Sequence, residues 1–293
     1  MYELLQTGER SYYINSPARI GVFVENAAEV YLIDSGNDKD AGRRIKKILE
    51  QHDWHLKAVI NTHSNADHIG GNQFLQQQYG CDIFAHGIEA DFARHPLLEP
   101  SFLYGAYPCK DLRHKFLLAA ESNVKDISDS GFPRQFQVIK LPGHFFHMIG
   151  IRTPDDVVFL ADCISSPETI GKYKVTFIYD VEKYLETLTM LEKMEAKIFV
   201  PAHAQVTEDL TSLLAVNRQA VFNVADKLLD ICKTPLNFEG ILKEIFSVYE
   251  LTMNFEQYVL VGSTIRSYLS WLKDDEKLIV VFKDNTLLWH ANV

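Results

Sequence analysis

The spacing of hydrophobic residues changes repeatedly along the first half of the chain, which predicts strands that alternate with helices. Short runs rich in β-branched and aromatic residues are expected to form strands at 20–24, 30–33, 56–60 and 82–85. Residues 40–51 place their apolar side chains on one helical face, and a second helix is expected at 69–79. Strands that alternate with helices in this way predict an α/β domain.

The pattern is less regular over residues 87–135, which are rich in aromatic residues, prolines and mixed charge. Long irregular stretches inside compact domains tend to be functional. Residues 102–108 are therefore expected to form a lid over an active site, with plain packing or a dimer surface as the alternatives. A helix is expected at 181–195. Strands are expected at 136–139, 148–152, 156–160 and 198–200.

At about residue 206 the hydrophobic pattern changes from alternating strands and helices to a mainly helical one. A long helical stretch at 207–232 ends just before Thr234-Pro235, which is a boundary signal. Two helices and two strands follow, at 237–249, 254–272, 277–282 and 286–290. Three helices followed by a hairpin are the outline of a winged helix. The sequence thus predicts a large domain, 1–205, and a small winged-helix-like domain, 206–293.

Composition and charge narrow the choice of partners. The chain has 293 residues, 47% of them hydrophobic, and a net charge of −10, which disfavours a nucleic-acid substrate. The helix expected at 254–272 carries Arg266 as its only Lys or Arg. No run of 18 apolar residues predicts a membrane span, and no signal peptide is visible. The cysteines form no Cys-x-x-Cys pair, so we expect reduced thiols in a cytoplasmic protein.

Four polar clusters share one position in the pattern, since each follows a predicted strand. They are His63 to His68, His144, Asp162 and His203. Loops beyond strand ends carry function in layered α/β folds because the sheet holds them in place. Histidine and aspartate suit zinc, iron or manganese. The sequence therefore predicts a metal site, and the turn Asp34-Ser35-Gly36 is expected to support its edge rather than to act in catalysis.

Four motifs resemble, in order and spacing, those of the metallo-β-lactamase superfamily. They are His63-x-Asn65-x-Asp67-His68, Gly143-His144, Asp162 and Ala202-His203. The resemblance covers roughly residues 10–205. It implies a four-layer αββα sandwich with a two-metal site at one edge of the sheets. The expected fold class is therefore α/β, with this sandwich followed by the small winged-helix-like domain.

The resemblance also implies which side chains hold the two metals. The first metal would be bound by His63, residue 65 and His144. The second would be bound by Asp67, His68 and His203, with Asp162 bridging the two. A water shared by the metals would lose a proton near neutral pH and attack as a metal-bound hydroxide. Asp67 would also act in catalysis by orienting that hydroxide, and the expected cofactor is one or two zinc ions.

Position 65 departs from the family pattern, because a second histidine is expected there and Asn65 is present. An amide oxygen is a weaker ligand than imidazole for zinc. We therefore expect the second metal position to bind tightly, and the first to be weak or to take iron or manganese. An equally weighted alternative is that Asn65 caps the helix that starts near Asp67.

Other side chains near these motifs have competing interpretations. Tyr104 and Tyr107 are candidate substrate contacts. His86 and His147 fit no family motif, so a structural role is favoured for both. Cys163 is expected to be a buried thiol, since neighbouring strand residues point to opposite faces.

The expected function is metal-dependent hydrolysis of a small thioester, ester, lactone or related acyl compound, as in the glyoxalase II-like branch that the sequence broadly resembles. Its C-terminal part does not resemble the glutathione-binding helices of that branch. One alternative is a phosphodiesterase or ribonuclease of the same superfamily. Another is a non-catalytic binder whose metal occupancy is incomplete because of Asn65. The expected partner is a small-molecule substrate, and neither nucleic acid nor a membrane is expected as a partner. A homodimer is the alternative that the sequence leaves open.

Overall fold

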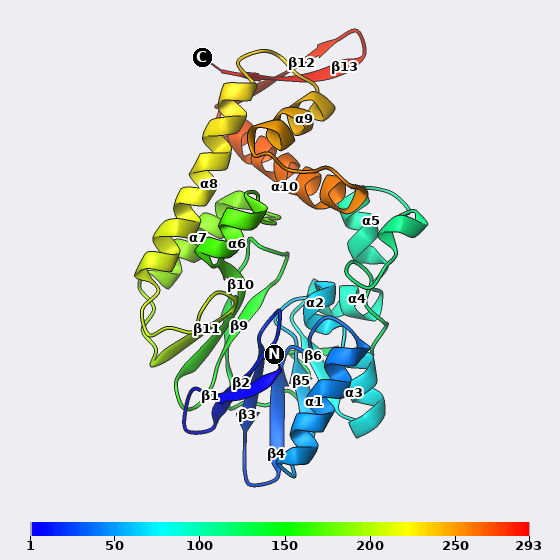
Figure 1. Ribbon diagram of the computed structural model, residues 1–293, viewed down its shortest axis with the longest axis vertical. Coiled ribbons are helices and arrows are strands. Elements are labelled where there is room, and N and C mark those ends of the chain that lie inside the picture. Colours follow the sequence, from blue (N-terminus) through cyan, green and yellow to red (C-terminus); the bar gives the residue numbers. More distant parts are fainter. Residues whose placement is uncertain (1, 293) are drawn as a thin grey trace.

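A computed structural model describes residues 2–292 and contains two packed β-sheets with helices on their outer faces (Figure 1). The strands of the first sheet follow one another in chain order. They are β1 (Glu3–Gln6), β2 (Ser11–Asn15), β3 (Ile20–Val24), β4 (Glu29–Ile33), β5 (His55–Ile60), β6 (Asp82–Ala85) and β7 (Val124–Asp126). From β4 to β7 the strands pair in parallel, so their carboxyl ends meet at one edge of the sheet.

The second sheet has the strand order β11-β10-β9-β8. Its members are β8 (Gln137–Lys140), β9 (Ile149–Arg152), β10 (Val157–Ser165) and β11 (Ile198–His203). The strands β10 and β11 pair in parallel, whereas β9 pairs antiparallel with β8 and β10. The carboxyl ends of β10 and β11 therefore lie together.

Helices complete the four layers. On the first sheet they are α1 (Lys39–Gln51), α3 (Asn72–Tyr79) and α4 (Ile88–Arg94), and on the second they include α7 (Val181–Leu191) and α8 (Thr211–Ile231). The short helix α6 (Pro167–Tyr173) packs against α8. The predicted αββα sandwich is confirmed. Within residues 2–292, none of the helices combines the length and the apolar character that crossing a bilayer requires.

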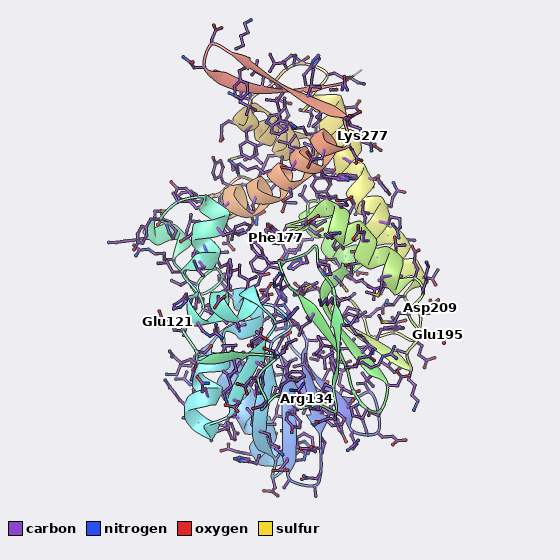
Figure 2. All side chains as sticks on the ribbon, turned by 180° about the vertical axis from the view of Figure 1, so that it is seen from behind. Glu121, Arg134, Phe177, Glu195, Asp209 and Lys277 are labelled. Atoms are coloured by element: carbon purple, nitrogen blue, oxygen red, sulfur yellow. The ribbon has the colours of Figure 1, made fainter. Side chains whose placement is uncertain are left out.

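Alternating side chains along the strands build two cores on either side of the second sheet. In β10, Val157 and Phe159 face the space between the sheets, while Val158 and Leu160 face the outer helices. Phe23 of the first sheet joins the inner core. Figure 2 shows that side chains fill the space between the layers. The two sheets are thus held rigidly against each other.

The C-terminal residues form three helices and a hairpin where the hydrophobic pattern predicts them. They are α8 (Thr211–Ile231), α9 (Phe238–Val248), α10 (Phe255–Asp274), β12 (Leu278–Lys283) and β13 (Thr286–Ala291). In Figure 1, α10 lies above both sheets and reaches α5 (Leu98–Tyr104). Leu160 and Leu188 pack in the same core as Leu228 and Ile265, so this core continues across residue 206. The likeness to a winged helix stays a prediction.

Three parts of the fold differ from the sequence-based expectation. The strands β1 and β2 and the helix α6 were not expected. Residues 87–135 are more regular than expected, because they contain α4, α5 and β7, and the proposed lid at 102–108 begins inside α5. The strand expected at 156–160 extends to Ser165, so Asp162 lies within β10 rather than after it.

Candidate metal centre

The strand ends at one edge of the two sheets bring the predicted ligands together. His63 follows β5, and Asp67 and His68 lie on α2 (Ala66–Ile69), which begins a few residues later. His144 lies in the turn between β8 and β9, and His203 is the last residue of β11. Because the packed sheets fix these strand ends, the loops hold their side chains in a defined arrangement.

Gly143 allows His144 to reach the site. Its φ is +123°, and a Cβ atom there would lie 2.3 Å from the backbone nitrogen of Tyr184 on α7. A side chain would therefore collide with α7 as well as strain the backbone. The Gly-His motif thus has a steric reason in this fold.

An irregularity in β10 directs Asp162 toward the histidines. The register with β11 shifts on both sides of Ala161, whose φ is +50°. Leu160 and Cys163 both face the outer core, although strict alternation would place them on opposite faces. Bulges re-aim side chains in this way. The prediction that Cys163 is a buried thiol is confirmed.

The candidate ligand atoms form two groups that share Asp162. The first group consists of His63, His144 and Asp162. The second consists of Asp67, His68, His203 and Asp162, and within each group the ligand atoms lie within 4.8 Å of one another. Asp162 Oδ1 lies 3.0 Å from His68 Nε2 of the second group, and Asp162 Oδ2 lies 3.7 Å from His144 Nε2 of the first. Asp162 is therefore placed to serve both groups, as a bridging ligand must.

Buried polar atoms at this point fit a cation. His63 Nε2 is buried and has no hydrogen-bond partner among residues 2–292. His68 Nε2 and Asp162 Oδ1 are also buried and, although 3.0 Å apart, do not have the geometry of a hydrogen bond. Leaving such an atom unpaired costs about 1–3 kcal/mol. A divalent metal ion between these atoms would satisfy all three, and imidazole and carboxylate are the ligands that zinc takes in proteins.

The charges of the two groups also fit a cation. Burial lowers the pKa of His203, but Asp162 and Asp67 raise it, to about 10. The same opposing effects leave the pKa of His68 well above its usual value. The carboxylates thus hold protons on two enclosed histidines at neutral pH. A metal ion would displace these protons, because a histidine ligand must be neutral.

Asp34 supports two of the candidate ligands from behind. Its Oδ2 lies 2.8 Å from His68 Nδ1, and it accepts hydrogen bonds from the backbone and hydroxyl of Thr62 at 2.8 and 2.7 Å. The Thr62 hydroxyl in turn lies 3.1 Å from His63 Nδ1. A donor bond from Nδ1 leaves Nε2 free to bind metal. The prediction that the Asp34 turn supports the edge of the site is confirmed.

We expect Asp34→Asn to weaken metal binding by about 10- to 100-fold. Asparagine tolerates the left-handed backbone of Asp34 (φ +66°), but its amide would oppose the Nδ1–H of His68 and disturb the tautomer that binds metal. Equilibrium dialysis followed by metal analysis measures the effect. Asp40→Asn, at an exposed position of α1, is the control. Equal affinity in both variants would refute the role of Asp34.

Asn65 directs its amide oxygen into the first group. It precedes α2, but its side chain makes no capping hydrogen bond, so the capping interpretation is wrong. Its Oδ1 instead lies 3.3 Å from His144 Nε2, and its Nδ2 donates to Glu99 Oε1 at 2.7 Å. The structure thus places all seven predicted residues at one site.

A cavity of about 660 Å³ opens onto this site. Asn65, Asp67, His144, Asp162 and His203 line it, together with apolar side chains from distant parts of the chain. These include Leu103, Phe116, Leu117, Val175, Phe177, Leu260 and Val261. Phe177 is labelled in Figure 2, below α10 and near the middle of the molecule. The helix α10 therefore forms part of the cavity wall.

Other candidate residues lie outside this cavity. Tyr104 packs against Phe255 with ring centroids 5.9 Å apart, and Tyr107 is 68% exposed; their role as substrate contacts stays a prediction. His86 and His147 belong to neither ligand group.

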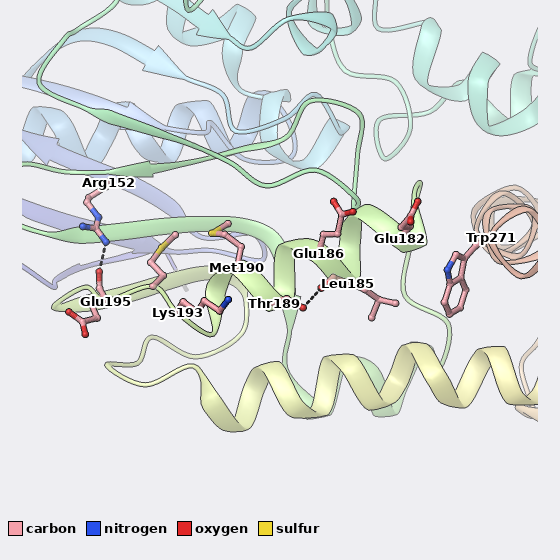
Figure 3. A pocket seen from close by; sticks show the side chains of 10 residues that line it. Arg152, Glu182, Leu185, Glu186, Thr189, Met190, Lys193, Glu195 and Trp271 are labelled. Carbon is pink, nitrogen blue, oxygen red and sulfur yellow. Dashed lines mark hydrogen bonds between the residues drawn. The ribbon is translucent and has the colours of Figure 1, made fainter. Parts of the chain in front are cut away.

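A larger hollow of about 1,020 Å³ runs along α7, as Figure 3 shows, and none of its lining residues is a candidate ligand.

Sequence reasoning missed several residues that line the cavity. Glu168 and Lys172 lie on α6, which begins with Ser166 as its cap and Pro167 in its first turn. A serine followed by proline is a known start signal for a helix, so this element could have been found. The contribution of Leu260 had no local signal, because it depends on how α10 packs across the sheets.

Comparison with a known structure agrees with this architecture. A beta-lactamase domain protein from Burkholderia ambifaria superimposes with a TM-score of 0.72 at 13% sequence identity. The superposition covers 99% of this chain and 93% of that one. At this identity the likeness concerns the fold, which the two chains share over nearly their whole length.

Curated relatives and a family model identify the lineage. A hydroxyacylglutathione hydrolase of Pelagibacter ubique is 36% identical over 62 residues, covering 21% of this chain and 25% of that protein. Hydroxyacylglutathione hydrolase GloC of Haemophilus influenzae is 29% identical over 48% of this chain and 62% of that protein. Both matches span less than two thirds of the relative. The family model for the metallo-beta-lactamase superfamily matches residues 21–203, which contain every candidate ligand. This chain belongs to the metallo-β-lactamase superfamily.

Proposed function

We propose that this protein hydrolyses a small thioester or ester whose acyl part is apolar. The observation that carries the proposal is the cavity of about 660 Å³ that ends on the candidate ligands. Cavities of about 300–1,000 Å³ bind small molecules in proteins. The two relatives named as hydroxyacylglutathione hydrolases act, by that name, on an acyl group joined to a thiol.

The cavity wall favours an apolar acyl group. Leu260 and Val261 of α10 line it together with Phe116, Leu117 and Phe177. Burying an acyl chain among such side chains contributes about 0.8 kcal/mol for each CH₂ group. The C-terminal residues would therefore help to select the substrate.

The candidate ligands would have two roles, metal binding and orientation of the attacking water. His63, Asn65 and His144 would hold one metal and Asp67, His68 and His203 the other, with Asp162 between them. Bound metal supplies an activated water and polarises the bond under attack. Asp67, which lines the cavity and has a side chain that is 41% exposed, would orient that water. We assign zinc to the second position, and iron or manganese to the first because Asn65 offers an oxygen.

A phosphodiester substrate suits this cavity less well. Among the described lining residues Lys172 is the one Lys or Arg, whereas Glu99, Glu168 and Glu256 contribute carboxylates. Phosphate groups need positive charge around them. The electrostatics thus favour an uncharged acyl compound.

A substrate panel with added zinc, manganese or iron tests the proposal. It compares thioesters of increasing acyl length with bis-p-nitrophenyl phosphate, single-stranded RNA and nitrocefin. We expect turnover of thioesters, with kcat/KM rising with acyl length until the cavity is full. Cleavage of the phosphodiesters alone would assign the alternative function, and full metal loading without any turnover would indicate a binder.

We expect Leu260→Asn to lower kcat/KM for the longer thioesters by about 10-fold, mainly through KM. The substitution keeps the number and branching of the side-chain heavy atoms but places a polar group against the acyl chain, at a cost of about 1–3 kcal/mol. Leu287→Asn on the exposed side of the hairpin is the matched control. If the two variants have the same acyl-length profile, the role of α10 in substrate binding is wrong.

A further inference from the structure

The side chain of Asn65 is held by one contact outside the candidate ligand groups. Its Nδ2 donates to Glu99 Oε1 at 2.7 Å, and the backbone N–H of Ala66 also donates to the Glu99 carboxyl group. Glu99 lies on α5 and is only 5% exposed. A helix from the segment 87–135 thus places a buried carboxyl group directly behind a candidate ligand.

This contact decides which end of the amide faces the site. An asparagine amide has a donor end and an acceptor end, and either could point to His144 if nothing else constrained it. The carboxyl oxygen that faces Asn65 accepts a hydrogen bond whether the group is ionised or protonated on its other oxygen. When this oxygen accepts, the amide NH₂ faces Glu99 and the amide oxygen faces His144, which is the orientation in the structure.

The resulting spacing is that of two ligands of one metal. Asn65 Oδ1 and His144 Nε2 are 3.3 Å apart. Metal–ligand bonds of about 2.1 Å at a tetrahedral angle separate two ligand atoms by about 3.4 Å. With the opposite amide orientation, an NH₂ group without a free electron pair would occupy this position and exclude a metal.

We propose that Glu99 is a positioning residue of the first metal site: it fixes the Asn65 amide so that its oxygen becomes a metal ligand. The site then offers two imidazole nitrogens and two oxygens, from His63, His144, Asn65 and Asp162. This donor set suits a metal that accepts oxygen, such as manganese, better than a site with three imidazoles does. The proposal concerns metal binding alone and does not depend on which substrate is hydrolysed.

Glu89 provides a matched control, because it is a second buried carboxyl group beside the same loop. It accepts hydrogen bonds from the backbone and hydroxyl of Ser64 and from the backbone of His147, at 3.0, 2.6 and 2.7 Å. It makes no hydrogen bond to a candidate ligand side chain among the described residues. Glu89→Gln therefore perturbs the loop to a similar extent without freeing the Asn65 amide.

Equilibrium dialysis of metal-depleted protein against Mn²⁺ and Zn²⁺, with metal analysis, tests the proposal. Glu99→Gln allows either amide orientation, so we expect it to weaken one Mn²⁺ equivalent by about 10- to 100-fold and to leave the tight Zn²⁺ equivalent unchanged. Glu89→Gln should bind both metals like the wild type. In an Asn65→Ala background, adding Glu99→Gln should have no further effect on Mn²⁺ affinity.

The double variant Asn65→Asp/Glu99→Gln should regain Mn²⁺ binding, because a carboxylate presents an oxygen in either orientation and the new glutamine can donate to it. Circular dichroism checks that each variant is folded, and the double variant carries the test if Glu99→Gln alone does not fold. Wild-type Mn²⁺ affinity in folded Glu99→Gln would overturn the proposal. So would a folded double variant that binds no Mn²⁺, or an additive loss in the Asn65→Ala background.

Discussion

We expect Asp162→Ala to lower kcat/KM by at least about 1,000-fold, which corresponds to roughly 4 kcal/mol of lost transition-state stabilisation. Asp162 is the one residue that both candidate ligand groups contain. Its two oxygens lie 3.0 Å from His68 Nε2 of the second group and 3.7 Å from His144 Nε2 of the first. Without this carboxylate each group loses an anionic ligand.

Metal analysis of the purified variant, together with thioester kinetics, checks this expectation. Both metal equivalents should fall, whereas the Asn65→Ala variant should lose only the first. Asp226→Asn, at an exposed position of α8, is the control for a lost aspartate charge. An Asp162→Ala protein that retains two tightly bound metals would show that the carboxylate is not shared.

The sequence alone was sufficient to predict the candidate ligands because they depend on local features. His63, Asp67, His68 and His203 follow or end β-rich runs, and a parallel sheet brings such ends to one edge. The exact position of Asp162 was harder to predict, because the hydrophobic pattern gives no sign of the strand irregularity at Ala161. The predicted strand boundary was wrong, and the role of Asp162 as a metal ligand stays a prediction.

The residues around the ligands were harder to predict, because they come from segments that are distant in the chain. Asn65 and Glu99 are separated by 34 residues, and a buried glutamate is not distinguishable from an exposed one in a single sequence. Tyr104 and Tyr107 were chosen for their aromatic character, yet Leu103 and Phe116 from the same region line the cavity. Which face of α5 points inward is set by its contact with α10.

The division of the chain at residue 206 illustrates the same limit. The mainly helical pattern of residues 206–293 predicts a separate domain, and the helices of this segment lie where they were expected. Their apolar faces, however, join the outer core of the second sheet, where Leu228 packs in one cluster with Leu160 and Leu188. A shared core of this kind predicts cooperative unfolding rather than two independent transitions.

We therefore expect Leu228→Ala to destabilise the whole protein, by about 2–5 kcal/mol, because it opens a cavity in a core that both parts of the chain build. Leu228 is fully buried, whereas Phe222 on the same helix is 39% exposed, so Phe222→Ala is the matched control with an effect of about 1 kcal/mol or less. Urea unfolding followed by circular dichroism gives the stability, and a chromogenic chelator reports metal release in the same titration. Both signals should move together to lower urea. If metal release keeps its wild-type midpoint while part of the helical signal is lost earlier, residues 206–293 unfold as an independent domain, and α10 is then a mobile wall of the cavity rather than a fixed one.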